Sequence, residues 1–134
     1  MKLEPFLMER WQSLHEHHVE INLSDSGVHP LSVRELIPDG ADQEALIAQR
    51  LGYTQTNGTE ALRGQIAALY EGAGPDNVLV TTGGIEANFL SVWRLLEPGD
   101  EVVAMTPNYM QIHGAAESLG ATVIPWRLEA DFDA

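Results

Sequence analysis

Cysteine is absent from the sequence, so disulfide bonds and thiolate metal sites are excluded. No apolar run approaches the roughly 18 residues that a helix needs to cross a bilayer. The N-terminal stretch "MKLEPFLMERWQ" carries charges among its apolar positions, unlike a secretory signal. The 134 residues have the size of one ordinary domain, and 44% of them are hydrophobic. We therefore expect a soluble, cytoplasmic, globular protein.

Positive charge is scarce. Seven Lys and Arg residues stand against 20 Asp and Glu, which gives a net charge of −13. Nucleic acids need a basic surface, so the composition argues against a nucleic-acid-binding protein. The overall field would also repel an anionic ligand, and a bound phosphate would have to be held by local backbone dipoles and a few placed cations. Lysine is the scarcest cation, because the only one is Lys2.

The first half of the chain has the pattern of an N-terminal helix followed by loops and short helices. Thr59 is typical of a helix N-cap, and Gly72 is typical of the position just past a helix end. The expected helices are 3–18, 33–36, 42–51 and 60–71, and the expected loops are 25–32 and 52–59.

From residue 76 onwards, apolar strand patterns alternate with helical patterns. The stretch "EPGD" has proline and glycine where a type II turn requires them. This alternation predicts two βαβ units with parallel pairing, and the continuous apolar strands favour helices on both faces. The fold class is therefore α/β: an N-terminal helical arm followed by the βαβαβ start of a mainly parallel sheet. Strands are expected at 78–82, 102–106 and 122–126, and helices at 85–96 and 109–119.

Two glycines, Gly83 and Gly84, stand between the first strand and the helix after it. They favour one of two structures: a tight turn, or an anion cup in which the amides of Gly84 and Ile85 hold a phosphate. Parallel strands end at one edge of a sheet, so these amides should lie near Tyr109, which follows the second strand. A phosphorylated planar ring would suit that pair of features. The alternative for Tyr109 is packing against its own loop.

Other ligand signals are weak. Dinucleotide-binding and P-loop glycine patterns are both absent. In "HEHH", His15 and His18 have helical ligand spacing, but no third ligand is evident nearby. A solvated helix end is favoured over a metal site, and no metal is expected.

Two stretches, "YTQTNGTEALRGQIAALY" and "VLVTTGGIEANFLSVWRLLEPGDEVVAMTPNYMQIHGAAESLGATV", together resemble fold type I pyridoxal-phosphate enzymes, specifically class I/II aminotransferases. The resemblance covers residues 53–126. Its pieces are Tyr and Gly with Leu-Arg before a helix, then Thr-x-Gly-Gly, Pro-Gly-Asp, Pro-x-Tyr and Gly-Ala. The stretch 26–36, "SGVHPLSVREL", has a weaker resemblance to the capreomycidine-synthase-like branch.

The resemblance implies pyridoxal 5'-phosphate as cofactor and a role for each matched position. The amides of Gly84 and Ile85 resemble the phosphate contacts, and Tyr109 resembles the aromatic residue that stacks on the pyridine ring. Tyr53 resembles the tyrosine that reaches the phosphate in the neighbouring subunit, which implies a homodimer with shared active sites. Gly27 resembles the loop glycine near the substrate carboxylate, although the family's Gly-x-Pro is Gly-Val-His-Pro here.

The family also uses a lysine that bonds the cofactor, a carboxylate at the pyridine nitrogen and an arginine for the substrate. None has a counterpart at the matched positions, and Lys2 precedes all of them. We therefore expect no catalytic residue here and interpret the chain as the N-terminal part of an aminotransferase acting on amino and 2-oxo acids. Residues 1–30 would form the arm and substrate loop, and 31–134 the first part of the cofactor-binding large domain. The alternatives are a lyase, decarboxylase or cyclase with the same cofactor, or a non-catalytic module.

Overall fold

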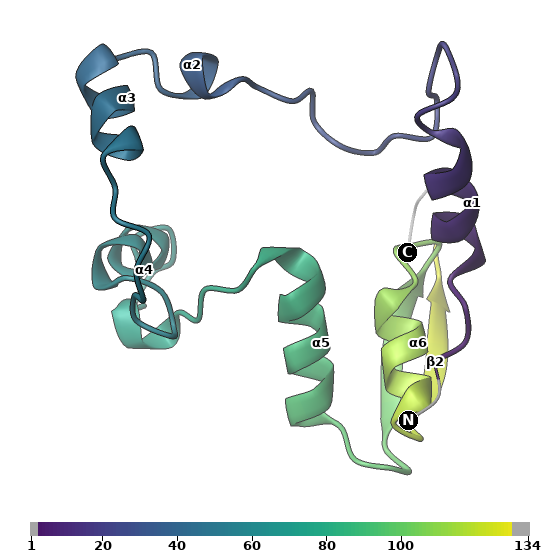
Figure 1. Ribbon diagram of the computed structural model, residues 1–134. Helices are drawn as coiled ribbons and strands as arrows, with labels where there is room; N and C mark the ends of the chain where they lie inside the picture. The colour runs from purple at the N-terminus through teal and green to yellow at the C-terminus, as the bar shows by residue number, and fades with distance from the viewer. Residues whose placement is uncertain (1–2, 130–134) are drawn as a thin grey trace. The chain divides into compact units, whose positions relative to one another are not determined.

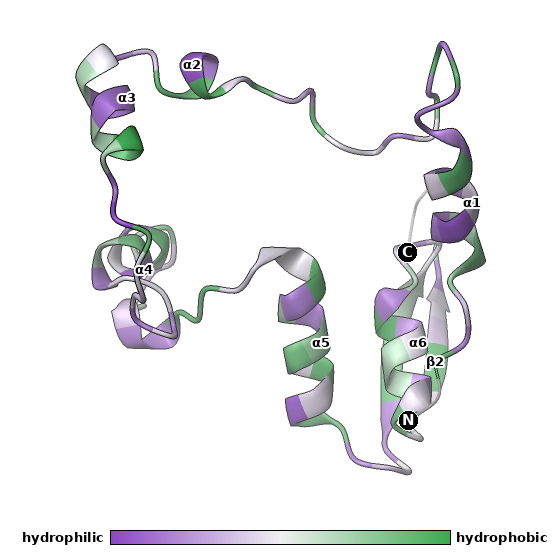
Figure 2. Ribbon diagram, in the orientation of Figure 1, coloured by the Kyte–Doolittle hydropathy of each residue, from purple (hydrophilic) through white to green (hydrophobic). Residues whose placement is uncertain are grey.

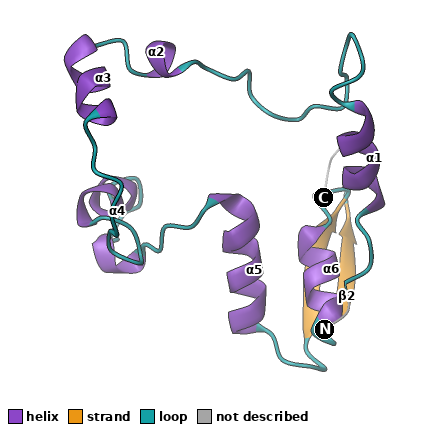
Figure 3. Cartoon of the chain, viewed as in Figure 1, coloured by secondary structure: helices purple, strands orange, loops and turns teal. Residues whose placement is uncertain are grey.

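The computed structural model describes residues 3–129. Within this range the chain forms two compact units, residues 3–18 with 79–129 and residues 19–78. Helices and a short parallel sheet make up the structure (Figure 3), which confirms the α/β class. No helix between residues 3 and 129 is long and apolar enough to span a membrane. The predicted domain boundary at residue 30 concerns the complete enzyme and stays a prediction.

The first unit contains the sheet and three helices (Figure 1). Two strands pair in parallel, with Glu101 opposite Thr122 and Thr106 opposite Arg127. The chain passes through one helix between them, as parallel pairing requires. The elements of this unit are α1 (Leu7–His15), α5 (Gly83–Leu95), β1 (Glu101–Thr106), α6 (Gln111–Ser118) and β2 (Thr122–Arg127).

The strand expected at 78–82 is not formed, so the prediction of two βαβ units was wrong by one strand. Val78 has extended dihedral angles (φ −116°, ψ 127°), but a strand also needs a hydrogen-bonding neighbour. The sheet within residues 3–129 consists of β1 and β2 alone. One βαβ unit, β1–α6–β2, is therefore present, and residues 78–82 lead into α5 without forming a strand.

The core of this unit is small and lies between α5, α6 and the sheet. Val92 of α5 packs with Ala115 and Ala116 of α6 and with Ala121, and larger residues such as Leu96 cover the cluster. Figure 2 shows hydrophobic and hydrophilic bands along α5, as expected for a helix with one covered side. Half-buried and exposed residues alternate along β1. Helices on both faces were expected, but only one face of β1 is covered by the described residues.

The second unit consists of short helices joined by loops. Thr59 caps the helix expected at 60–71, as predicted. Its side chain accepts a hydrogen bond from Leu62 N at 3.3 Å. Ser32 and Glu35 form a capping box, and hydrogen bonds from the Ser32 hydroxyl and amide lower the pKa of the Glu35 carboxyl. The elements are α2 (Val33–Leu36), α3 (Gly40–Ile47), α4 (Glu60–Ala67) and the 3-10 helix η1 (Pro75–Asn77).

Candidate functional site

Gly83 makes the turn into α5. Its φ is +80°, in the left-handed region where a side chain is strained, and its amide donates to Thr81 O at 3.0 Å. The tight-turn interpretation therefore accounts for Gly83.

Gly84 needs a different explanation, because it does not have a positive φ. A Cβ built on Gly84 would meet no heavy atom within 4 Å. The amides of Gly84 and Ile85 have no acceptor within residues 3–129 and belong to the donors that a helix leaves free at its N-terminus. Open space beside free amides at the positive end of a helix suits an anion. The structure thus supports the cup interpretation at Gly84.

The carboxylate of Glu86 binds the amide of Thr82 and not the amides of Gly84 and Ile85. Its Oε2 accepts a hydrogen bond from Thr82 N at 2.5 Å, one residue before α5 begins. An acidic group here complements the helix dipole. The contact leaves the Gly84 and Ile85 amides available to a ligand.

Gln111 bonds the start of α6 to the first turns of α5. Its Nε2 donates to Ile85 O at 2.8 Å, and its Oε1 accepts from Asn88 Nδ2 at 3.0 Å. Gln111 lies two residues after Tyr109, so these bonds bring the Tyr109 loop to the end of α5 that carries the Gly84 amide. The predicted proximity of the two features is confirmed at the level of these elements.

Tyr109 is 39% exposed, and its ring contacts the N-terminal segment. The ring centroids of Tyr109 and Phe6 lie 5.4 Å apart at an interplanar angle of 54°. Its amide donates to Asn108 Oδ1 at 2.7 Å. The ring therefore packs on a distant segment while the Tyr109 backbone is held by its own loop, and the residue as a whole stays partly exposed.

A buried hydroxyl at the same edge lacks a partner. Thr106 Oγ1, at the carboxyl end of β1, is buried and has no hydrogen-bonding partner in the described part of the chain. An unsatisfied buried hydroxyl costs about 1–3 kcal/mol.

Sequence reasoning missed Gln111, Asn88 and Phe6. A signal for the first two existed: a glutamine opening a helix directly after Pro-x-Tyr, and an asparagine in an otherwise largely apolar helix. Phe6 carried no comparable signal, because its partner is about 100 residues away in the sequence.

Tyr53 and Gly27 belong to the other unit. Tyr53 is fully exposed, at 109% of its reference area, in the loop before α4. The Gly27 amide donates to Asp25 Oδ1 at 2.8 Å, and a Cβ on Gly27 would lie 3.0 Å from that oxygen. This contact explains the glycine locally. The phosphate role of Tyr53 and the substrate role of Gly27 stay predictions, and Lys2 lies outside the described residues.

The histidine-rich stretch has local contacts. The rings of His15 and Trp11 lie 4.8 Å apart, and His17 Nε2 lies 3.4 Å from Glu16 Oε1. Within residues 3–129, no group of three or more His, Cys, Asp or Glu side chains is arranged to hold a metal ion.

The family model of aminotransferase class I and II matches residues 20–134. The chain belongs to this family.

Known proteins cover nearly all of this chain. Capreomycidine synthase from Streptomyces vinaceus is 35% identical over 96% of it. A PLP-dependent aminotransferase structure from Streptococcus suis has a TM-score of 0.87 and 32% identity over 98% of it. The structure of the PLP-dependent cyclase OrfR has a TM-score of 0.79 and 31% identity over 95%. The chain spans about a third of these proteins, namely 33%, 36% and 34% of their respective lengths.

Pyridoxal 5'-phosphate (PLP) is the cofactor of this family, and the described residues fit it. The open space at Gly84 and the free amides suit its phosphate, and the partly exposed aromatic residue Tyr109 suits its pyridine.

Tyr109→Ala in the complete enzyme should weaken cofactor binding by about 1–3 kcal/mol, because an aromatic contact and its buried area are lost. Tyr109→Phe should cost much less, since the ring is kept. Titration of the apoenzymes with PLP, followed by absorbance, measures both. Equal affinity of the parent and the Ala variant would show that Tyr109 serves only packing.

Gly84→Ala and Gly83→Ala should have different effects. The added Cβ at Gly84 meets no protein atom, so folding should be retained while the methyl group obstructs the phosphate and weakens PLP binding. Gly83→Ala should lower the stability of the fold by about 1–2 kcal/mol, because alanine is strained at positive φ. Thermal unfolding of the apoenzymes and PLP titration separate the two effects. Unchanged PLP affinity in Gly84→Ala would contradict the anion cup.

Proposed function

We propose that the complete protein is a cytoplasmic PLP-dependent aminotransferase that moves an amino group from an amino acid to a 2-oxo acid. The observation that carries this proposal is the Gln111 bridge, which joins the free amides at Gly84 and Ile85 to the Tyr109 loop in a chain of the aminotransferase family.

Each residue of this arrangement has a binding or orienting task. The amides of Gly84 and Ile85 would donate to phosphate oxygens at the positive end of α5, where the open space at Gly84 would admit the phosphate. The Tyr109 ring would stack on the cofactor ring. When bound, PLP withdraws electrons from the bonds around the Cα of the amino acid. No residue of this chain is assigned a proton-transfer step.

These contacts explain how an acidic protein binds a dianion. With a net charge of −13, the overall field opposes phosphate binding. Amide donors at a helix end act on the phosphate over a few ångströms, a distance at which salt screens little. The repulsion from distant carboxylates is weakened by salt screening. The backbone of α5 therefore supplies the attraction that the composition lacks.

A cyclase acting through the same cofactor is the second candidate. It is favoured by the 35% identity to capreomycidine synthase over 96% of this chain and by the similarity to the cyclase OrfR. The weaker resemblance of residues 26–36 to the capreomycidine-synthase-like branch points the same way.

The two candidates differ in the fate of the amino nitrogen. An aminotransferase should move ¹⁵N from a labelled amino acid to an added 2-oxo acid, one for one. A cyclase should consume the labelled amino acid, retain its ¹⁵N in the product and need no 2-oxo acid. Mass spectrometry after incubation with a panel of amino acids, with and without 2-oxo acids, distinguishes them. Retention of all label in a cyclic product would contradict the aminotransferase proposal.

We also propose that the enzyme is a homodimer with shared active sites, in which Tyr53 reaches the phosphate bound by the partner subunit. The support is that the Tyr53 side chain is fully exposed in its own unit, so its own core does not hold it. The family resemblance implies the same role. A phenol donating to a phosphate dianion forms a charge-assisted hydrogen bond worth about 1.5–3 kcal/mol.

Subunit complementation tests the shared site at limiting PLP concentration. A Tyr53→Phe subunit is mixed with one lacking the lysine that bonds the cofactor. The heterodimer should combine one doubly damaged site with one intact site, so activity should exceed that of both parents. A mixture that forms heterodimers but gains no activity would show that Tyr53 acts within its own subunit or serves only the fold.

A further inference from the structure

Arg63 is the one buried charged residue in the part of the chain that the structure describes, with 6% of its surface exposed. It lies in α4, four residues after the helix N-cap at Thr59. A buried guanidinium is costly to desolvate unless its donors are well satisfied. Its contacts should therefore identify what the charge does.

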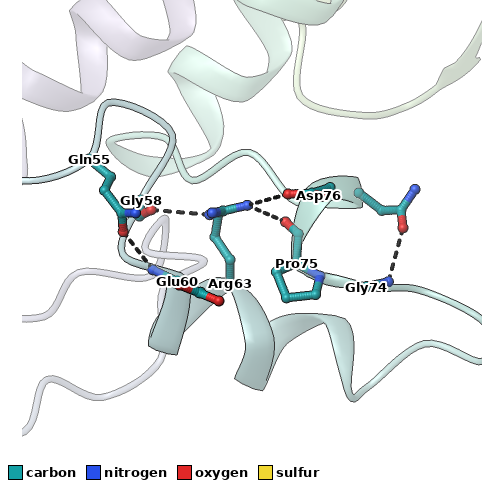
Figure 4. A network of polar contacts seen from close by, with 8 residues as sticks. Gln55, Gly58, Glu60, Arg63, Gly74, Pro75 and Asp76 are labelled. Atoms are coloured by element: carbon teal, nitrogen blue, oxygen red, sulfur yellow. Dashed lines mark hydrogen bonds and ion pairs between the residues drawn. The ribbon is translucent and has the colours of Figure 1, made fainter.

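The guanidinium joins two backbone segments on either side of it (Figure 4). Its Nε donates to Gly58 O at 3.1 Å, and its Nη1 donates to Pro75 O at 2.6 Å. Nη1 also lies 3.4 Å from Asp76 Oδ1, but that carboxylate is fully exposed. An exposed partner contributes little, so the two carbonyl contacts dominate.

Gly58 belongs to the loop that carries Tyr53, and this loop is fastened at three points. Besides the bond from Arg63, the Gly58 amide donates to Gln55 O at 3.1 Å, and Gln55 Oε1 accepts from Glu60 N at 2.8 Å. Figure 4 shows Gln55 and Gly58 on one side of Arg63 and Pro75 with Asp76 on the other. Tyr53 is two residues before Gln55, so their Cα atoms lie within about 7 Å of each other. The fastened segment therefore limits where Tyr53 can go.

We propose that Arg63 is a positioning residue for the cofactor site, acting through Tyr53. Its buried guanidinium ties the Tyr53 loop to η1 and so holds the exposed phenol in the direction from which it donates to the phosphate of the partner subunit. This inference rests on the proposed role of Tyr53. It explains why the site has arginine, because two different guanidinium nitrogens, Nε and Nη1, reach carbonyls on two segments, whereas all three lysine donors lie on one terminal nitrogen.

A double-mutant cycle in the complete, PLP-loaded enzyme tests the coupling. Arg63→Lys keeps the charge and loses the fork, and it should weaken PLP binding about 3- to 10-fold, while Tyr53→Phe should weaken it about 10-fold or more. If Arg63 acts through Tyr53, the double variant should bind PLP no more weakly than Tyr53→Phe alone. Arg94→Lys, the same change at an exposed position in α5, is the matched control and should bind PLP like the parent.

Amide hydrogen exchange of the holoenzyme provides a second measurement. Arg63→Lys should raise exchange in residues 52–59 while the α5 amides stay protected. If that variant does not fold, Gln55→Ala replaces it, because it loosens the same loop without disturbing a buried charge. Independent, additive losses from the two single changes would overturn the inference, as would parent-like PLP affinity in Arg63→Lys. Parent-like affinity in Tyr53→Phe would overturn both the Tyr53 role and this inference, and the aminotransferase proposal would still stand on the ¹⁵N experiment.

Discussion

The candidate site depends on one side chain, the amide of Gln111. It is a donor to α5 at Ile85 O and an acceptor from α5 at Asn88 Nδ2, so both of its polar atoms are satisfied by the neighbouring helix. A single hydrogen bond would let α6 pivot, whereas two bonds from one planar amide fix its direction. The carbonyl Ile85 O can only accept, so the Gln111 side-chain atom that faces it is the nitrogen, Nε2. These two hydrogen bonds of Gln111 therefore keep the start of α5, with the Gly84 and Ile85 amides, near the Tyr109 loop.

Features governed by short-range chemistry were predictable from sequence. The N-cap at Thr59 is present, and Gly99 and Gly120 take the positive φ angles expected of a turn glycine and a helix stop. Helices were located correctly, with errors of a few residues at their ends. Local hydrogen bonds and steric limits decide these features, and the residues that make them are close together in the sequence.

Features that depend on distant partners were not predictable in the same way. The segment 78–82 has the composition of a strand and begins with extended dihedral angles at Val78, but strand formation requires a neighbour that the described residues do not supply. The contacts of Phe6 with Tyr109 and of Arg63 with Pro75 likewise join residues far apart in the sequence. The expected proximity of the Gly84 and Tyr109 elements is present, but the Gln111 hydrogen bonds to Ile85 and Asn88 produce it, and the cofactor roles of these residues stay predictions.

Two alanines of α6, Ala115 and Ala116, determine how closely α5 and α6 approach each other. Ala116 is fully buried at 0% exposure, and with Ala115 it packs against Val92. Small side chains let two helices approach closely, and the interhelical distance follows the size of the residues at the contact. The phosphate donors start one helix and the aromatic ring precedes the other. Larger side chains at 115 and 116 would therefore push α5 and α6 apart and increase the distance between the Gly84 amide and the Tyr109 ring, without any change in those two residues.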